Sequence, residues 1–165
     1  MEPLFTNSFK FTREIFIELF KDLYRLYRIV LLLVGIAILV FAIVSVGGYY
    51  VVTVIFFVFA AYFIYMSAGG YLLSANRAYK KMLMQGCDLE NTFTAQFRAD
   101  ALNDAKGTYD YTQIKRVRET KELLLLKTDN NITVPLKKDC FTTGTYEEFK
   151  KFIQEKCVNA RILYK

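Results

Sequence analysis

The 165-residue chain contains no histidine. The side chains that could take part in chemistry are therefore its cysteine thiols, its carboxylates and its clustered cations. Without histidine, the common Ser/His and Cys/His nucleophile systems are excluded. Neither of the glycine-rich phosphate motifs GxxxxGK[ST] and GxGxxG occurs. The carboxylates from Asp88 onward are numerous but show no spacing typical of a metal site. We therefore expect no enzymatic activity, no metal and no cofactor.

Three cysteines, Cys87, Cys140 and Cys157, are too few and too widely spaced for a disulfide framework. We expect free thiols in a reducing compartment. Cys140 follows Lys137 and Lys138, and a nearby ammonium group could lower its pKa and make it reactive. The alternative is a small, buried apolar residue at a strand-to-helix junction.

An uncharged block dominates the chain, since no Asp, Glu, Lys or Arg occurs between Ile29 and Asn76. As one helix, its 48 residues (76 − 28) would be about 72 Å long, and a bilayer core is about 30 Å thick. Two helices fit. We predict spans at about 29–46 and 49–67, which together with their flanks form a hairpin over 29–76.

The predicted break lies at Gly47 and Gly48, because glycine tolerates the positive φ that a sharp reversal can require. Tyr49 and Tyr50 follow it, and tyrosine suits the headgroup layer. The alternative for the whole block is a pair of core helices in a soluble protein. The other 117 residues (165 − 48) are too few to wrap such a pair.

Basic residues flank the block at both outer ends and are absent from its tip. The positive-inside rule then predicts a two-span protein of the cell membrane with both termini in the cytoplasm. The candidate contacts with the inner leaflet are Arg25, Arg28, Arg77, Lys80 and Lys81.

The spans contain no ionisable carboxylate, lysine or arginine, which favours an anchor over an ion or substrate pathway. Small residues share faces at i, i+7: Gly35 with Ala42, and Ala60 with Ser67. Such faces allow close helix packing, within the hairpin or between copies in an oligomer. The hydroxyls of Ser45 and Thr53 are expected to bond back to their own helices.

The cytoplasmic N-terminal segment, residues 1–28, contains a predicted amphipathic helix over 12–28. Thr12 is a suitable N-cap. Apolar residues recur at helical spacing, at Ile15, Leu19, Leu23 and Leu26. This helix lies either on the membrane or against the cytoplasmic domain.

Residues 77–165 are predicted to form a small α+β domain on the cytoplasmic side, after a continuation of the second span to near Gly86. Alternation over 91–102 predicts one half-buried strand, followed by a turn at 103–107. Further strands are expected at 114–119, 122–128 and 132–136, with a turn at 129–131 between the last two. Pro135 indicates a sheet edge or a strand end.

A closing helix follows the strands. Thr145 and Glu148 form a capping box, and an apolar stripe runs through Phe149, Phe152, Ile153 and Cys157. An amphipathic helix over a small antiparallel sheet is therefore the expected architecture. The tail 161–165 receives no assignment.

The order of these segments resembles the YcxB-like family of bacterial membrane proteins. The resemblance rests on two adjacent membrane helices followed by YDYTQIKRVRET, a leucine-rich strand, ITVPLKKDCF and YEEFKKFIQEK. It extends to FKFTREIFIELF near the start. The resemblance implies a pleckstrin-homology-like cytoplasmic domain, and it implies neither a reaction nor catalytic residues.

The expected function is that of a non-enzymatic, membrane-anchored interaction module, whose partner is a protein or anionic phospholipid. A second set of cations, Lys115, Arg116 and Arg118, could face lipid, or could be ordinary strand charge. Nucleic acid is not an expected partner, because the cations gather beside the apolar block. The alternative function is immunity or self-protection against a toxin or bacteriocin.

Overall fold

Residues 2–48, 50–84, 92–104 and 107–164 are described by a computed structural model, and they divide into two units. One unit, Phe16–Met84, is helical. The other combines Met1–Ile15 with Gln85–Lys165 and contains the strands. The first residues of the chain thus fold with its last part, although the whole helical unit separates them in sequence.

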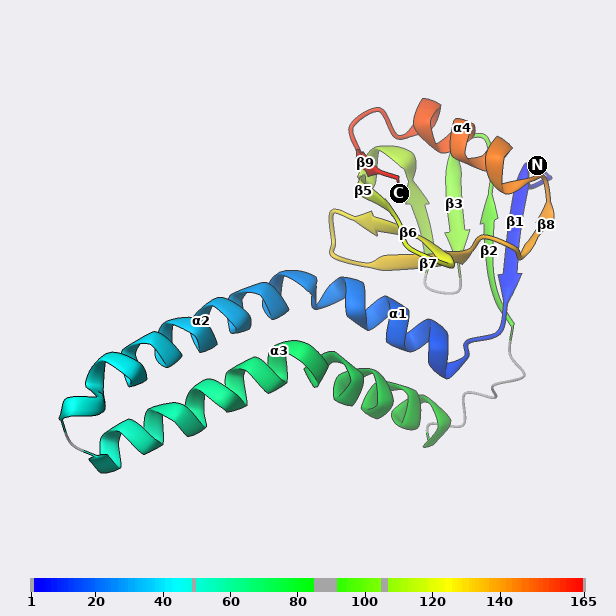
Figure 1. Cartoon of the computed structure of the whole chain (residues 1–165). Helices are drawn as coiled ribbons and strands as arrows, with labels where there is room; N and C mark the ends of the chain where they lie inside the picture. The colour runs from blue at the N-terminus through cyan, green and yellow to red at the C-terminus, as the bar shows by residue number, and fades with distance from the viewer. Residues whose placement is uncertain (1, 49, 85–91, 105–106, 165) are drawn as a thin grey trace. The chain divides into compact units, whose positions relative to one another are not determined.

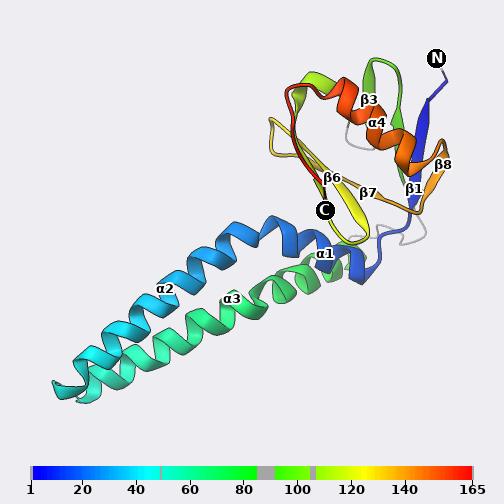
Figure 2. The same ribbon diagram turned by 45° about the horizontal axis from the view of Figure 1, so that its top comes forward.

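The uncharged block forms a helical hairpin made of α2 (Arg25–Val44) and α3 (Tyr50–Met84), which run side by side (Figures 1 and 2). The helix predicted over 12–28 is divided into α1 (Arg13–Leu23) and the start of α2. The backbone kinks at Tyr24, whose N–H still bonds to the carbonyl of Phe20. Thr12 caps α1 as predicted, accepting the N–H of Ile15 at 3.4 Å.

The turn of the hairpin is a short 3-10 helix, Ser45–Gly47. Gly48 has φ −102°, so the expectation that the glycines supply positive φ is wrong. The 3-10 geometry makes the reversal instead, and the Gly48 N–H bonds to the Ser45 carbonyl at 3.0 Å. Tyr49 lies outside the described residues.

The two polar side chains near the turn behave differently. The Ser45 hydroxyl donates to the Phe41 carbonyl of its own helix at 2.8 Å, as predicted. The Thr53 hydroxyl instead donates to the Ser45 carbonyl at 3.1 Å, across the turn, because the reversal brings the two helix ends together. This bond ties the start of α3 to the end of α2.

The predicted small-residue faces are buried in the hairpin. Gly35 and Ala42 are buried on α2, and Ala60 and Ser67 are buried on α3. A Cβ on Gly35 would lie 2.9 Å from Ile64 Cγ1, which is too close for real carbon atoms. The predicted close packing within the hairpin is therefore confirmed at Gly35.

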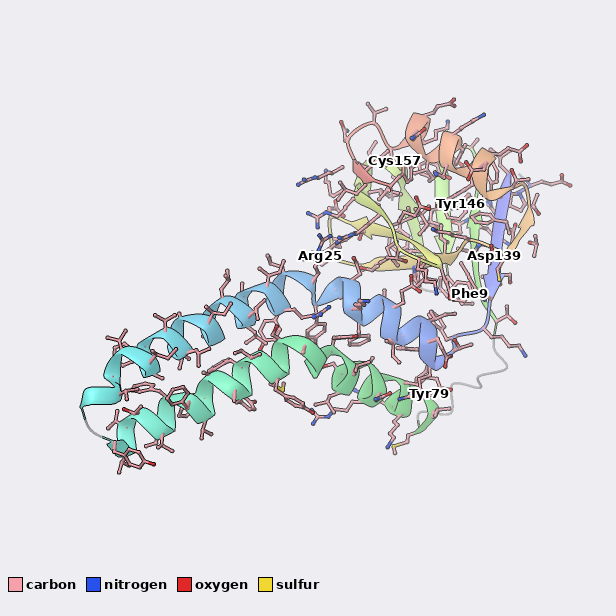
Figure 3. The ribbon with its side chains drawn as sticks, in the orientation of Figure 1. Phe9, Arg25, Tyr79, Asp139, Tyr146 and Cys157 are labelled. Carbon is pink, nitrogen blue, oxygen red and sulfur yellow. The ribbon has the colours of Figure 1, made fainter. Side chains whose placement is uncertain are left out.

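Helix α3 continues beyond the predicted span to Met84, as expected, and the predicted end near Gly86 lies outside the described residues. Its second half packs against α1 through aromatic rings. The rings of Phe16 and Tyr79 meet edge to face with centroids 5.8 Å apart (Tyr79 is labelled in Figure 3).

The strands form two sheets in place of the single antiparallel sheet that was predicted. The first has the order β4-β3-β2-β1-β8 and is antiparallel throughout. Its strands are β1 (Phe5–Phe9), β2 (Phe93–Phe97), β3 (Ala101–Asp104), β4 (Gly107–Asp110) and β8 (Phe141–Thr143). Strands β1, β4 and β8 had no sequence-based assignment.

The second sheet has the order β7-β6-β5-β9. Its strands are β5 (Ile114–Glu119), β6 (Leu123–Thr128), β7 (Thr133–Lys137) and β9 (Arg161–Leu163). Strand β9 runs parallel to β5, so this sheet is mixed. Strand β7 is at the edge, as Pro135 predicted.

The single strand predicted over 91–102 is in fact two strands, β2 and β3, joined by a bend after Phe97. The Arg98 N–H bonds to the Ala101 carbonyl at 2.9 Å and closes the bend. Phe97 and Leu102 are paired across the two strands and both are fully buried. Because apolar residues continue on both sides of the bend, the sequence pattern does not indicate where the first strand ends. The turn predicted at 103–107 begins later, because Asn103 and Asp104 still belong to β3.

One core joins both sheets to α4 (Tyr146–Lys156), which lies over β1, β2 and β3 in Figures 1 and 2. The capping box of Thr145 and Glu148 is present, and Phe149 and Ile153 are fully buried. The Phe149 ring contacts those of Phe97 at 4.5 Å, Phe141 at 4.9 Å and Phe5 at 5.4 Å. This aromatic cluster holds α4 against strands from both ends of the chain.

Candidate functional site

The five cations predicted to face a membrane all lie on the helical unit. Arg25 is the first residue of α2, labelled in Figure 3, and it is exposed. Arg77, Lys80 and Lys81 lie on the last turns of α3 and are exposed as well. Arg28 differs, since its side chain is half-buried between the two helices.

Arg28 connects α2 to α3. Its Nε donates to the Ser67 carbonyl at 2.9 Å, and its guanidinium lies 4.7 Å from the ring centroid of Tyr71. Both contacts are made by the guanidinium group within the hairpin. Arg28 therefore packs the two helices together as well as carrying a surface charge. Sequence reasoning placed it with the lipid-facing set because the register of α2 against α3 was unknown.

The five cations do not lie at one level of the hairpin. Arg28 is level with Ser67 and Tyr71 of α3. Arg77 is six residues beyond Tyr71 and Lys81 is ten, which corresponds to about 9 and 15 Å along a helix. The basic region is therefore a band about 15 Å deep and not a single ring.

The apolar length of the hairpin matches a bilayer. Sixteen uncharged residues (44 − 28) follow Arg28 in α2 before the turn, and they rise about 24 Å against a hydrocarbon thickness of about 30 Å. Both α2 with its 3-10 extension and α3 are long and apolar enough to cross a membrane.

Most of the apolar surface of these helices faces outward. Only 17% of the most apolar stretch of each helix is buried. Large side chains such as Leu33, Val44 and Val58 are more than half exposed. A core helix of a soluble protein buries most of such a stretch, so this exposure favours membrane helices over core helices.

A second group of cations lies on the sheet β7-β6-β5-β9. Lys115 and Arg116 of β5 are exposed, and Arg118 is half-buried. The strand register places Arg116 opposite Lys127 of β6 on one side and Arg161 of β9 on the other. Sequence reasoning missed Lys127 and Arg161, because the register was unknown and the tail had no assigned strand.

Comparison with known proteins adds one match. The family model described as YcxB-like protein matches residues 96–153. The chain carries a YcxB-like domain. No curated protein and no solved structure matches the chain. The resemblance stated from the sequence is therefore confirmed over this segment.

The match runs from the end of β2 into α4 and so covers most of the strand unit. Strands β1 and β9 lie outside the matched residues, yet β1 pairs with β2 and β8, and β9 pairs with β5. The YcxB-like domain is thus completed by residues from both ends of the chain.

A polar cluster of the YcxB-like domain surrounds Glu119, whose side chain is only 9% exposed. Lys138 Nζ lies 2.6 Å from Glu119 Oε1 and also donates to the Thr120 carbonyl at 2.8 Å. Lys150 Nζ lies 3.9 Å from Glu119 Oε2. The contacts connect the end of β5 to the β7–β8 loop and to α4.

Two tyrosines complete this cluster. The Lys150 ammonium lies 4.5 Å from the Tyr164 ring centroid and 5.5 Å from that of Tyr146. Burial, and then the negative charge of Glu119, raise the pKa of Tyr146, so its hydroxyl stays protonated. The cluster contains a neutral phenol, two ammonium groups and one paired carboxylate, and none of these is an activated nucleophile. Its contacts are therefore best explained as structural ones that hold Tyr164 against the domain.

The cysteines of the YcxB-like domain are free thiols where they are described. Cys157 follows α4 and is buried, and burial raises the pKa of its thiol to about 12. Cys140 is half-buried, and Cys87 lies outside the described residues. Within the described ranges, no group of three or more Cys, Asp or Glu side chains is placed to hold a metal ion.

Proposed function

We propose that this chain is a non-enzymatic membrane protein whose helical hairpin crosses the cell membrane twice and anchors the YcxB-like domain as a cytoplasmic interaction module. The observation that carries the proposal is the outward-facing apolar surface of α2 and α3, of which only 17% is buried in the most apolar stretches. A bilayer is the apolar environment that fits a hairpin of this length.

The orientation rests on charge. Arg25 and the three cations at the end of α3 lie beyond the apolar length, and the tip between Ser45 and Tyr50 carries no charge. Basic residues stay on the cytoplasmic side, so both termini and the YcxB-like domain would be cytoplasmic. The exposed cations Arg25, Arg77, Lys80 and Lys81 would contact anionic headgroups there.

Cysteine labelling of intact cells tests both insertion and orientation. In a chain with its native cysteines replaced, Gly47→Cys places a thiol at the tip, where a side chain meets nothing within 4 Å. Thr142→Cys places one at an exposed site of the strand unit. An impermeant maleimide should label the first only, and both after permeabilisation. Labelling of Thr142→Cys in intact cells would overturn the orientation.

The fold of the domain is part of the same proposal. Two sheets of mainly antiparallel strands followed by an amphipathic closing helix support a pleckstrin-homology-like domain. The alternative role, protection against a toxin or bacteriocin, is separated from this proposal by a pull-down from detergent. Recovery of a toxin would favour protection, and recovery of a soluble cytoplasmic partner would favour the interaction module.

A further inference from the structure

We propose that the exposed end of the outer face of β5 and β9, bordered by Lys127 of β6, is a docking surface for the headgroups of anionic phospholipid, contacted by Lys127, Arg116 and Arg161. The proposal names the partner of the anchored domain and so rests on the proposed function. It concerns a different surface from the cations at the ends of the hairpin helices.

The three cations form a row across three neighbouring strands. Arg116 is paired with Lys127 on β6 and with Arg161 on β9. Neighbouring strands lie about 4.8 Å apart, so the row is about 10 Å long. Lys115 adds a fourth cation beside it, where the register shifts between Ile114 and Arg116.

The row faces away from the core. Val117, next to Arg116, and Leu126, next to Lys127, are fully buried core residues. Ile162, next to Arg161, packs against the same core. Because side chains alternate along a strand, the three cations point to the opposite face. Arg116 and Arg161 are exposed and Lys127 is half-buried. Leu125, two residues before Lys127 on the same face, is only 3% exposed, so the accessible surface is the end of the face that carries the row.

The row is electrostatically unfavourable by itself. Like charges directly opposite each other destabilise a sheet, and Arg116 has such a neighbour on both sides. Among the residues that the structure describes, no carboxylate forms an ion pair with Arg116, Lys127 or Arg161. By contrast, Lys138 and Lys150 of the same unit both pair with Glu119. An anion from outside the chain would relieve this repulsion.

Anionic lipid is the partner that the chain itself brings close. A hairpin anchored in the bilayer keeps the YcxB-like domain within a tether length of headgroups, so even weak contacts act at a high effective concentration. A bilayer also presents many phosphates at once, as a row of three or four cations requires. Each cation near an anionic leaflet contributes a factor of about five in affinity (about 1 kcal/mol).

The test uses the full chain in nanodiscs of phosphatidylcholine, with and without phosphatidylglycerol. A fluorophore on Asn130→Cys, in the exposed turn after Lys127, reports on the surface, in a chain with Cys87 and Cys140 changed to Ser. Acrylamide, a neutral quencher, should reach the dye less well in the anionic discs. Docking should be lost near 1 M salt, where the screening length is about 3 Å.

Paired variants make the result specific. Arg116→Gln with Arg161→Gln should lower the docking equilibrium constant about 25-fold, the product of two factors of about five. Arg116→Lys with Arg161→Lys should preserve docking. Lys151→Gln with Lys156→Gln removes two exposed charges from α4 and should leave docking unchanged. If the control pair lowers docking as much as the arginine pair does, the assigned docking surface is wrong.

Other outcomes are equally decisive. Failure of the chain to enter nanodiscs would overturn the anchor and with it this proposal. Entry without any effect of phosphatidylglycerol would overturn the docking surface alone. Inorganic phosphate, an acidic peptide or DNA can each be added to the neutral discs. If one of them protects the dye as well as phosphatidylglycerol does, that ligand replaces lipid as the partner and the lipid assignment is wrong.

Discussion

Asn7 of β1 holds Lys137 of β7 by both ends of its side-chain amide. Its Nδ2 donates to the Lys137 carbonyl at 2.7 Å, and its Oδ1 accepts the Lys137 N–H at 3.1 Å. Asn7 is fully buried, and the residues it joins are 130 positions apart. The amide acts as one more backbone unit beside the edge strand β7, and it ties the two sheets together.

Replacing Asn7 should destabilise the strand unit strongly. In Asn7→Ala the N–H and carbonyl of Lys137 both lose the partner that the fully buried Asn7 provides, which costs about 2–4 kcal/mol. Asn7→Asp keeps the shape but brings a charge against the Lys137 carbonyl, and we expect a loss at least as large. Urea unfolding in mild detergent measures both. Glu155→Ala, at an exposed site on α4, is the control, and equal stability of all variants would contradict the assigned role.

The hairpin should be sensitive at Gly35 and insensitive at Gly47. An alanine Cβ at Gly35 would lie 2.9 Å from Ile64 Cγ1 and 3.2 Å from the Ile64 backbone nitrogen. Overpacking of this kind costs about 1–3 kcal/mol. The midpoint of thermal unfolding in detergent should therefore fall for Gly35→Ala. It should stay unchanged for Gly47→Ala, where a Cβ meets nothing within 4 Å.

A second-site change sharpens this prediction. Ile64→Ala removes the contacting Cγ1, so the double variant Gly35→Ala with Ile64→Ala should lose less stability than the sum of the two single losses. If Gly35→Ala alone is neutral, the close approach of α2 and α3 at this position is wrong.

The features predicted correctly from the sequence are encoded locally. The capping box of Thr145 and Glu148 and the small-residue face at Gly35 each lie within a few helical turns, and the uncharged block is one continuous stretch of sequence. The family match over 96–153 likewise agrees with the motifs that suggested it. Spacing alone is enough for such features, since a helix brings i and i+3 or i+7 together.

The missed features depend on partners far away in the chain. Strand β1 pairs Phe5 with Phe97, and nothing local distinguishes such a five-residue segment as a strand. The four successive leucines of β6 hide the alternation that would assign each side chain to a face. Without that register, neither Lys127 nor Arg161 could be placed beside Arg116. For the same reason, Arg28 was predicted to contact lipid only, and its packing against α3 was missed.

Replacing Lys138 should lower the free energy of unfolding more than replacing Lys150, although both lysines contact Glu119. Lys138→Met removes the ammonium group nearest to a carboxylate that is only 9% exposed and leaves that of Lys150 at 3.9 Å. We expect a loss of about 3 kcal/mol, the lower end of what breaking a buried pair costs. Lys150→Met removes the more distant and more exposed partner and should cost about 1 kcal/mol.

Urea unfolding of the two lysine variants, compared at one pH and salt concentration, measures this order. The control is Lys156→Met, which removes an exposed charge from the same unit. A larger loss for Lys150→Met than for Lys138→Met would show that the cation contacts with Tyr146 and Tyr164 matter more than the ion pair.

Cys157 should be chemically inert in the folded chain and should make stability fall at high pH. Burial raises the pKa of its thiol from 9.0 to about 12. Because the thiolate is the nucleophile, iodoacetamide at pH 8 should modify Cys140, which is half-buried, much faster than Cys157. Mass spectrometry of the digested protein measures both rates, and equal rates would contradict the burial of Cys157.

The same shift sets the direction of the pH dependence. The native state keeps the Cys157 proton up to about pH 12, whereas the unfolded state loses it near pH 9. Below pH 9 both states are protonated and the contribution to stability is complete. Above pH 9 deprotonation favours the unfolded chain, so this contribution is lost as the pH rises toward 12. Cys157→Ala should reduce the slope of unfolding free energy against pH between 9 and 11, and an unchanged slope would assign the loss to other groups.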